Sequence, residues 1–491
     1  MTLRKFAIAL AVISAAAGFV ACNSSSYDNE ELILPSGTAV KSFSLAEDDS
    51  VMANLDSVFF TIDLVGGRIF NADSLPYGTK VTGLVPSITT LQTASNVELR
   101  VTRSNGTDTV YNYLTNSTEK IDFTNPVILR IASADGRNER NYTIRVNVHQ
   151  VKADSLTWGN DSRTTLPTSL ANPTAQRTVR KADDFYCLTQ NGNSYILGLH
   201  KGDIAGLNGA HPTIDDWEIR SIAFPFSPQI NSFAATDEAL FILDTDGNLW
   251  TSANDGTTWT ATSLKWHNIY GSHLSTLLGS LNTPEGWKVQ AYPSGDMQTL
   301  PSGMPVSGTS TPVSYTFPMS GQPQTLFVGG RKADGSLSPD TWGYDGHSWA
   351  KISKRPLPVA LEGVAIASYV TFKANANLSY TEFPSIIAFG GRDSSGAPTD
   401  TVYVSNDYGY NWKKADALLQ LPAEIGAFYN AQAYVMTSTF TASIIQPQIV
   451  KPIESWNCPY IYLFGGINSN GTLNNTVWRG TINHLTFKPI E

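Results

Sequence analysis

Two arginines occupy equivalent positions from which they could bind an anion. Arg331 and Arg392 each directly follow a pair of glycines, and the third such pair in the chain is followed by Ile467. A guanidinium presents a planar fork of donors that matches a carboxylate or a phosphate. The two side chains are therefore candidates to line one ligand-binding face. The alternative is that they bridge neighbouring elements or are solvated.

Two tyrosines are candidates for stacking on a sugar. Tyr408 and Tyr410 lie in a short polar segment that is rich in Asn, Asp and Gly. An exposed aromatic ring offers an apolar face to a sugar ring and a hydroxyl to its rim. The alternative is that both rings pack between structural elements.

The sequence gives little support for catalysis or metal binding. A sialidase-like glycosidase would need an arginine cluster, a Tyr–Glu nucleophile pair and an acid, but Arg and Glu are scarce in residues 153–491. The histidines lack zinc spacing, and Asp244–Asn248 lacks the closing Glu of a calcium loop. We predict no catalytic residue, metal or cofactor, and a glycoside-active propeller enzyme remains the alternative.

These residues lie within a repeated pattern. Three segments share an apolar run, a glycine pair and an aromatic residue twelve positions after the second glycine, and a second aromatic follows seven or nine positions later. We expect the glycines to end an inner strand, where they let a neighbouring backbone approach closely. The pattern resembles the kelch repeat of β-propellers. Its members are Gly329, Gly330, Trp342 and Trp349; Gly390, Gly391, Tyr403 and Trp412; and Gly465, Gly466, Trp478 and Phe487.

Further units extend the repeat through residues 153–491. Residues 185–195 and 240–250 match each other, and residues 274–292 form a degenerate unit. Six units predict a six-bladed propeller, with seven blades as the alternative. Residues 405–412 and 252–259 resemble the Asp-box, in which an Asp or Asn bonds its own turn and a Trp packs into the blade.

A separate domain precedes the propeller. Residues 36–152 contain short runs that alternate apolar and polar residues, divided by Gly-rich turns. This period of two is typical of sheets with one buried face. We predict a small immunoglobulin-like β-sandwich that acts as a spacer.

The N-terminus has the pattern of an export signal. Two basic residues precede an apolar stretch that is too short to span a bilayer. The stretch ends in a small residue and Cys22, which resembles a bacterial lipobox with Cys22 as the lipid attachment site. We predict a signal peptide over residues 1–21 and a polar tether over residues 22–35. The lipid would be the only membrane anchor and would hold the protein on the outer membrane, exposed at the cell surface.

Composition limits the function classes. The 491 residues carry a formal net charge of −9, which argues against a nucleic-acid partner. Low charge, 38 glycines and 26 prolines favour a turn-rich all-β protein. We expect a monomer. Cys187 and Cys458 remain after processing, and the sequence leaves open whether they are free thiols or a disulfide.

The arrangement of lipobox, immunoglobulin-like domain and kelch-like propeller resembles an uncharacterised family of surface lipoproteins of Bacteroidetes type. The resemblance covers essentially the whole chain. It implies an envelope-anchored module that binds or scaffolds a glycan or a protein partner.

Overall fold

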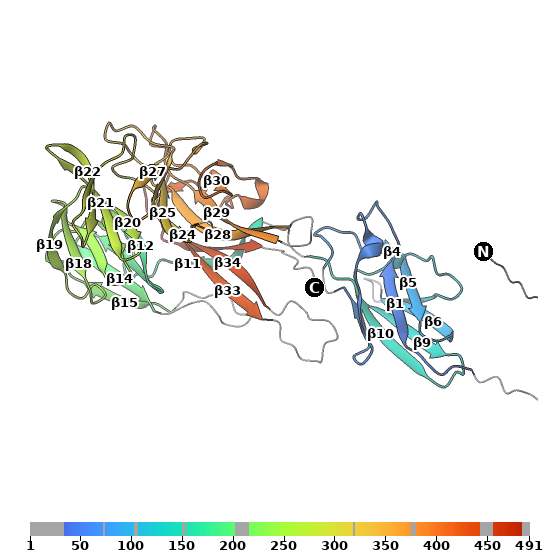
Figure 1. The fold of residues 1–491 in the computed structure, drawn as a ribbon. Helices are drawn as coiled ribbons and strands as arrows, with labels where there is room; N and C mark the ends of the chain where they lie inside the picture. The colour runs from blue at the N-terminus through green and yellow to red at the C-terminus, as the bar shows by residue number, and fades with distance from the viewer. Residues whose placement is uncertain are drawn as a thin grey trace, which may run out of the picture. The chain divides into compact units, whose positions relative to one another are not determined.

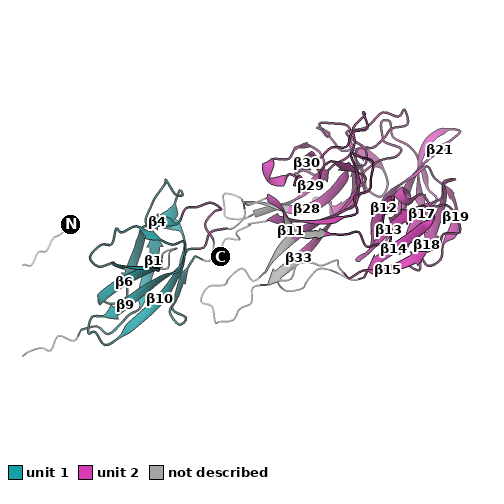
Figure 2. Ribbon diagram, turned by 180° about the vertical axis from the view of Figure 1, so that it is seen from behind, with its two compact units in different colours: residues 1–71, 81–146 teal, residues 72–80, 147–491 magenta. Residues whose placement is uncertain are grey.

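The computed structural model describes residues 34–71, 74–102, 107–149, 152, 155–201, 216–317, 320–374, 380–441 and 455–483. These residues form β-strands and three short 3-10 helices (Leu55–Ser57, Ile230–Ser232 and Ala417–Leu419), so the predicted all-β class is confirmed. None of the helices in the described ranges has the length and apolar character to cross a membrane. The chain divides into two compact units, residues 1–71 with 81–146 and residues 72–80 with 147–491 (Figure 2).

The first unit is built around a six-stranded sheet. Along its long strands alternate residues are buried, as the period of two predicts; Val97, Leu99 and Val101 face the core. In the order of pairing, the large sheet contains β2 (Thr61–Asp63), β3 (Arg68–Phe70), β10 (Glu139–Arg145), β9 (Val127–Ser133), β6 (Ala94–Thr102) and β7 (Asp108–Asn112). Two small sheets pair β1 (Val40–Leu45) with β5 (Pro86–Thr90), and β4 (Thr82–Leu84) with β8 (Ile121–Asp122).

The second unit contains six four-stranded antiparallel sheets within its described residues (Figure 1). Five of them use consecutive strands. They are β12 (Ala175–Lys181), β13 (Asp184–Asn191), β14 (Ser194–His200) and β15 (Glu218–Ile222); β16 (Ala234–Ala235), β17 (Leu240–Leu243), β18 (Asn248–Ser252) and β19 (Thr260–Lys265); β20 (Asn268–His273), β21 (Thr276–Thr283), β22 (Gly286–Tyr292) and β23 (Met297–Thr299); β24 (Val313–Thr316), β25 (Pro323–Val328), β26 (Thr341–Tyr344) and β27 (Trp349–Lys351); and β28 (Ala365–Ala374), β29 (Tyr380–Phe389), β30 (Val402–Ser405) and β31 (Lys413–Lys414).

The remaining sheet joins the two ends of the second unit. Its order is β33 (Gln432–Thr441), β34 (Ser455–Phe464), β36 (Val477–Asn483) and β11 (Ser155–Thr164). The first strand of the unit therefore forms the outer edge of the sheet made by its last strands. The side-chain amide of Asn483 donates to the carbonyl oxygen of Ser155 at 3.2 Å and to its Oγ at 2.9 Å. A two-stranded sheet of β32 (Phe428–Tyr429) and β35 (Ile467–Asn468) lies outside this set.

The six sheets follow one another in a ring. Each sheet contacts the next through its first strand: β12 contacts β16, β16 contacts β20, β24 contacts β28 and β28 contacts β33. Between the third and fourth sheets, β20 contacts β25, and β33 of the last sheet contacts β12 of the first. The first strands thus surround a common centre.

The glycine pairs allow the close approach that the sequence predicts. They follow β25, β29 and β34, which are the second strands of their sheets. The second strand lies in the middle of its sheet, and the last four residues of β25 are all buried, so the apolar run of the repeat is found there. A Cβ atom at Gly329 would lie 2.4 Å from the carbonyl oxygen of Leu361, and one at Gly390 would lie 2.5 Å from that of Phe428.

The first aromatic residue of each repeat lies on the third strand of its sheet; of the second aromatics, Trp349 begins the fourth strand β27 and Trp412 directly precedes β31. Trp342, Tyr403 and Trp412 are buried, whereas Trp349 and Trp478 are half-buried. The indole Nε1 of Trp412 donates to Thr341 Oγ1, in the neighbouring sheet, at 2.8 Å. Phe487 lies outside the described residues.

The Asp-box segments form the hydrogen-bonded turns that their pattern predicts. Asp407 Oδ1 accepts hydrogen bonds from Ser405 Oγ at 2.8 Å and from the Asn411 backbone amide at 2.9 Å. Gly409 has a φ of 81°. In the second copy, Asn254 Oδ1 takes the same place and accepts from the Thr258 amide at 2.9 Å. These segments fold and anchor hairpins.

A candidate binding cavity lined by the first strands

A cavity lies where the first strands meet. Its walls come from β12, β16, β20, β33 and the residues directly before β24. The cavity volume is about 180 Å³, well above what a single water molecule needs. Elements that are far apart in the sequence build this site together.

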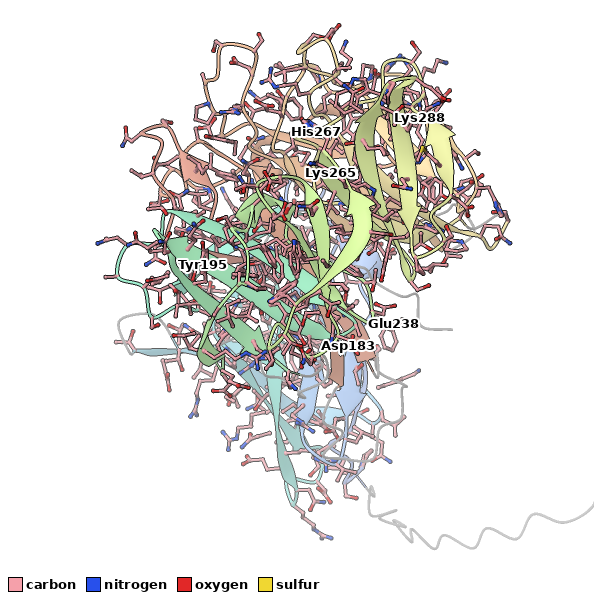
Figure 3. The ribbon with its side chains drawn as sticks, turned by 90° about the vertical axis from the view of Figure 1, so that its left-hand side faces the viewer. Asp183, Tyr195, Glu238, Lys265, His267 and Lys288 are labelled. Carbon is pink, nitrogen blue, oxygen red and sulfur yellow. The ribbon has the colours of Figure 1, made fainter. Side chains whose placement is uncertain are left out.

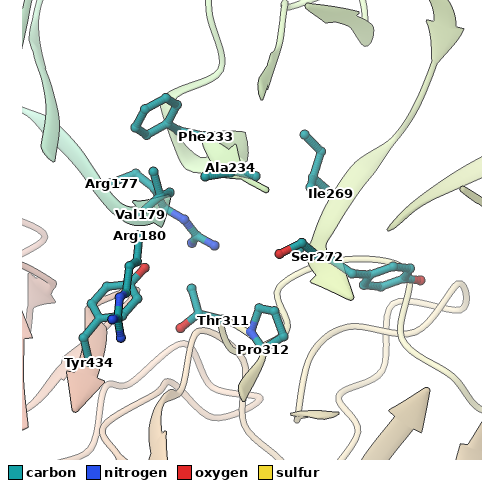
Figure 4. A pocket seen from close by; sticks show the side chains of 13 residues that line it. Arg177, Val179, Arg180, Phe233, Ala234, Ile269, Ser272, Thr311, Pro312 and Tyr434 are labelled. Atoms are coloured by element: carbon teal, nitrogen blue, oxygen red, sulfur yellow. The ribbon is translucent and has the colours of Figure 1, made fainter. Parts of the chain in front are cut away.

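Arg177 carries the positive charge of the cavity. It lies on β12, and its guanidinium extends into the cavity (Figure 4). Among the described residues of the second unit, arginines 180, 220, 331 and 392 form ion pairs, and Arg177 forms none. Its Nε atom is buried without a hydrogen-bond partner in the described part of the chain. Burial lowers the pKa of Arg177, but an arginine stays protonated in proteins, so the cavity holds a cation without a matching anion.

Two hydroxyl groups lie across the cavity from this cation. Ser272, on β20, and Thr311, just before β24, both line the cavity (Figure 4). Thr311 Oγ1 is buried and has no hydrogen-bond partner among the described residues. A hydroxyl can donate one hydrogen bond and accept others. The cavity therefore offers unused donors on opposite walls.

The second arginine of β12 differs from the first in its pairing. Arg180 also lines the cavity, but its Nη2 donates to Asp183 Oδ1 at 2.9 Å and its Nε donates to the carbonyl oxygen of Ala182 at 2.8 Å. Asp183 is exposed, as are Glu238 and Lys265 elsewhere on the unit (Figure 3). The charge of Arg180 is thus matched at the protein surface, and that of Arg177 is not.

The rest of the wall is largely apolar. Phe233, Ile269 and Pro312 contribute side chains (Figure 4). The hydroxyl of Tyr270 donates to the carbonyl oxygen of Pro305 at 2.6 Å, and that of Tyr434 donates to the carbonyl oxygen of Thr178 at 2.8 Å. Burial raises the pKa of Tyr434 to about 12. Both phenols are therefore neutral and already bonded, and they present ring faces or edges to a ligand.

The two arginines that the sequence marks as a ligand face bind a carboxylate of the chain itself. Arg331 donates to both oxygens of Glu362, at 2.6 and 3.0 Å, and Arg392 Nε donates to Oε1 at 2.7 Å. Burial alone would raise the pKa of Glu362, but the two guanidinium groups outweigh it and lower the pKa below its ordinary value. Arg392 also lies 4.5 Å from the centre of the Tyr429 ring. This geometry is that of the bridging alternative, because Glu362 already takes the place that an anionic ligand would fill.

The two tyrosines differ in their surroundings. The ring of Tyr408 is partly buried, with its centre 4.8 Å from that of Tyr315 and 5.5 Å from that of Phe317. Tyr410 is 44% exposed. Tyr408 therefore packs against the fourth sheet, and Tyr410 alone of the pair offers an open ring. Their role in sugar binding stays a prediction.

Asp244 stabilises a hairpin turn. Its Oδ1 accepts from the backbone amides of Asp246 at 2.9 Å and Asn248 at 2.8 Å, and its Oδ2 accepts from Trp250 Nε1 at 3.0 Å. Within the described ranges, no three His, Cys, Asp or Glu side chains come together as metal ligands would. Cys187 is a buried free thiol on β13. Cys22 and the side chain of Cys458 lie outside the described residues.

Arg177, Ser272 and Thr311 were not singled out by the sequence. Arg177 is one of a few arginines in residues 153–491 and belongs to no motif. The one available signal is its place on an alternating strand at the start of a repeat unit, since first strands face the centre of a ring. Which residues lie opposite depends on pairing between distant sheets.

Comparison with known proteins supports the division of the chain. The model described as the DUF6242 beta propeller domain matches residues 152–490, which confirms the predicted propeller. The model described as the domain of unknown function (DUF6242) N-terminal domain matches residues 36–146. No curated protein matches the chain.

Several solved structures match the chain at low identity and with TM-scores below 0.5. The structure of YjhT is 11% identical, and the alignment covers 65% of this chain and 96% of that one, with a TM-score of 0.38. AofleA from Arthrobotrys oligospora is 13% identical over 66% of this chain and 90% of its own, with a TM-score of 0.35. The six-bladed Aleuria aurantia lectin is 12% identical over 64% and 97%, with a TM-score of 0.31.

The assignment to a family therefore rests on the two family models, which match residues in both units. With an N-terminal domain and a β-propeller domain in this order, the chain belongs to the DUF6242 family.

Proposed function

We propose that the protein is a non-catalytic binding module whose β-propeller takes a ligand into the central cavity. The observation that carries the proposal is the combination of apolar walls with a half-buried arginine, Arg177, which forms no ion pair among the described residues and whose Nε is buried without a hydrogen-bond partner there. Ligand sites are commonly concave, mostly apolar and equipped with a few convergent polar groups. A segment of a glycan or of a protein partner fits this description.

The lining favours binding over glycoside hydrolysis. Glycosidases of most families need two carboxylic groups that flank the scissile bond. Among the described residues that line the cavity there is no carboxylate, imidazole or thiol. The alternative of a glycoside-active enzyme therefore gains no support from this site.

Several finer features of the assembly belong to the same proposal. We infer that each of the six four-stranded sheets is one kelch-like blade and that β11 closes the ring. The first unit would be an immunoglobulin-like spacer. Cys22 would carry the lipid that anchors a monomeric protein to the outer membrane, with the propeller exposed at the surface.

The test is a glycan-array and peptide-array binding screen of the full chain, paired with a panel of fluorogenic glycosides. A ligand should bind without turnover. Ser272→Trp should abolish binding in the cavity because the indole fills it, whereas Lys265→Ala, at an exposed position on β19, should leave it within about twofold. Turnover of a glycoside would overturn the non-catalytic assignment. Equal binding by Ser272→Trp would place the ligand outside the cavity.

A further inference from the structure

The cavity holds a charge that the chain itself does not balance. Removing a cation from water without a partner is costly. The arginines of the second unit that form ion pairs avoid this cost. Arg331, Arg392 and Arg180 each contact a carboxylate within 3 Å. Arg177 forms no ion pair among the described residues, and its Nε is buried without a hydrogen-bond partner there. Arg220 and Arg479 also have a buried, unbonded Nε, but of these three arginines only Arg177 lines the cavity.

A second polar group in the cavity, the hydroxyl of Thr311, also lacks a partner among the described residues. Thr311 Oγ1 is likewise buried without a partner in the described part of the chain. Arg177 lies on β12 and Thr311 lies just before β24, but both line the same cavity, as does Ser272 (Figure 4). A fork of N–H donors that faces hydroxyl donors is the arrangement that surrounds a bound carboxylate.

The size and walls of the cavity limit what can carry the anion. A volume of about 180 Å³ suits one sugar ring or one amino-acid residue. Phe233, Ile269 and Pro312 would contact the apolar face of that sugar ring or amino-acid residue. The overall net charge of −9 gives no long-range attraction for anions, so selectivity must come from contacts inside the cavity.

We propose that the central cavity binds a small carboxylate-bearing group, with Arg177 as the charged contact and Thr311 and Ser272 as hydroxyl donors. This inference rests on the proposed function and specifies its ligand. The carboxylate belongs to an acidic sugar or to the C-terminal residue of a peptide, and both present the same chemistry to the guanidinium. Arg177 acts here only in binding.

The experiment compares matched probes by isothermal titration calorimetry on the full chain. D-glucuronate is paired with D-glucose, and N-acetyl-L-alanine with its amide, so that each pair differs in its carboxylate. At least one carboxylate should bind at least about tenfold more tightly than its neutral counterpart, as expected for a charge-assisted contact. The pair that shows the preference distinguishes the sugar from the peptide source.

Substitutions of Arg177 are compared with the same substitution at an arginine outside the cavity. Arg177→Gln should weaken the carboxylate probe by about tenfold or more and remove the preference. Arg177→Lys keeps the charge but loses the fork of donors, so its affinity for the carboxylate probe should lie between those of the unchanged protein and Arg177→Gln. Arg355→Gln, at an exposed arginine that does not line the cavity, should stay within about threefold. Melting temperatures of all three variants verify that the cavity is still folded.

The outcomes separate this inference from the proposed function. If neutral ligands bind as tightly as carboxylates and Ser272→Trp abolishes both, the cavity is a binding site but the anion assignment is wrong. If Arg177→Gln leaves carboxylate binding unchanged, or neither carboxylate binds, the inference is likewise wrong. If Ser272→Trp leaves every ligand unaffected, the proposed site itself fails.

Discussion

Asp255 shows how one carboxylate connects two sheets. It lies in an Asp-box turn and accepts hydrogen bonds from Lys181 Nζ at 2.7 Å and from the Tyr186 hydroxyl at 2.5 Å, both in the first sheet. Its backbone carbonyl accepts a further bond from Arg220. Burial alone would raise the pKa of Asp255, but these partners outweigh it and lower the pKa to about 2.

This shift predicts a pH-dependent contribution to stability. Because the pKa is lower in the folded protein than the ordinary 3.8, the contribution is present above that value and is lost as the pH falls toward 2. Asp255→Asn should therefore reduce the free energy of unfolding by roughly 2 kcal/mol at pH 7. Chemical denaturation at pH 7 and at pH 2.5 measures the change, which should shrink at the lower pH.

Asp183→Asn is the matched control for this prediction. Asp183 pairs with Arg180 in an exposed ion pair, with 63% of its side chain accessible, so its loss should cost less than about 1 kcal/mol. Equal losses for the two variants, or a loss at Asp255 that does not depend on pH, would show that the buried network does not stabilise the fold.

The same scale shows what sequence can and cannot reveal about a site. The Asp-box carboxylate Asp407 and the turn carboxylate Asp244 bond to residues within six positions, so their roles follow from local spacing. Arg177 and Thr311 carry no local pattern, and they lie in one cavity only because distant strands meet there. Glu362 likewise belongs to no local sequence pattern, so it could not be predicted as the partner of Arg331 and Arg392, although both arginines were identified from the repeat.

The glycine pairs belong to the scale of the element. Both glycines of each pair have positive φ angles, such as 63° at Gly390 and 98° at Gly391. The Gly391 amide donates to the carbonyl oxygen of Phe428 at 2.8 Å. The pair therefore joins the end of one second strand to the segment that leads into the next sheet. Spacing in the sequence predicts this contact because the requirement is for backbone space, which glycine alone provides.

Two alanine substitutions separate backbone strain from lack of space. Gly396→Ala would be strained, with φ 83°, but would have nothing within 4 Å of its Cβ, so it should cost about 1 kcal/mol. Gly390→Ala would add a contact of 2.5 Å with the Phe428 oxygen and should cost about 2–4 kcal/mol. Urea denaturation of both variants gives the comparison. Similar losses would mean that the neighbouring segment moves aside easily.

At the scale of the whole molecule, we propose that β11 closes the ring. The strand pairs with β36 from Ser155 opposite Asn483 to Thr164 opposite Val477. Leu156 is buried in the core shared with the last two sheets. The register with β36 therefore makes the start of the second unit part of its last sheet.

Truncation tests the contribution of β11. Residues 147–491, which keep the strand, should show a single cooperative thermal transition. Residues 165–491 should unfold at a lower temperature and associate, because the edge of β36 would be exposed to another chain. Circular dichroism and gel filtration measure both effects. A monomeric 165–491 fragment with an unchanged melting temperature would contradict a closing role for β11.

The pairing of β11 with β36 also sets an order of events during synthesis. Asn483 and Ser155 are 328 residues apart, and ribosomes add about 5–20 residues per second. The first strand of the propeller therefore waits roughly 15–65 seconds for its partner to be made. During this interval β11 has an open edge, so a nascent chain needs a chaperone or rapid folding of the intervening blades to keep that edge from pairing elsewhere.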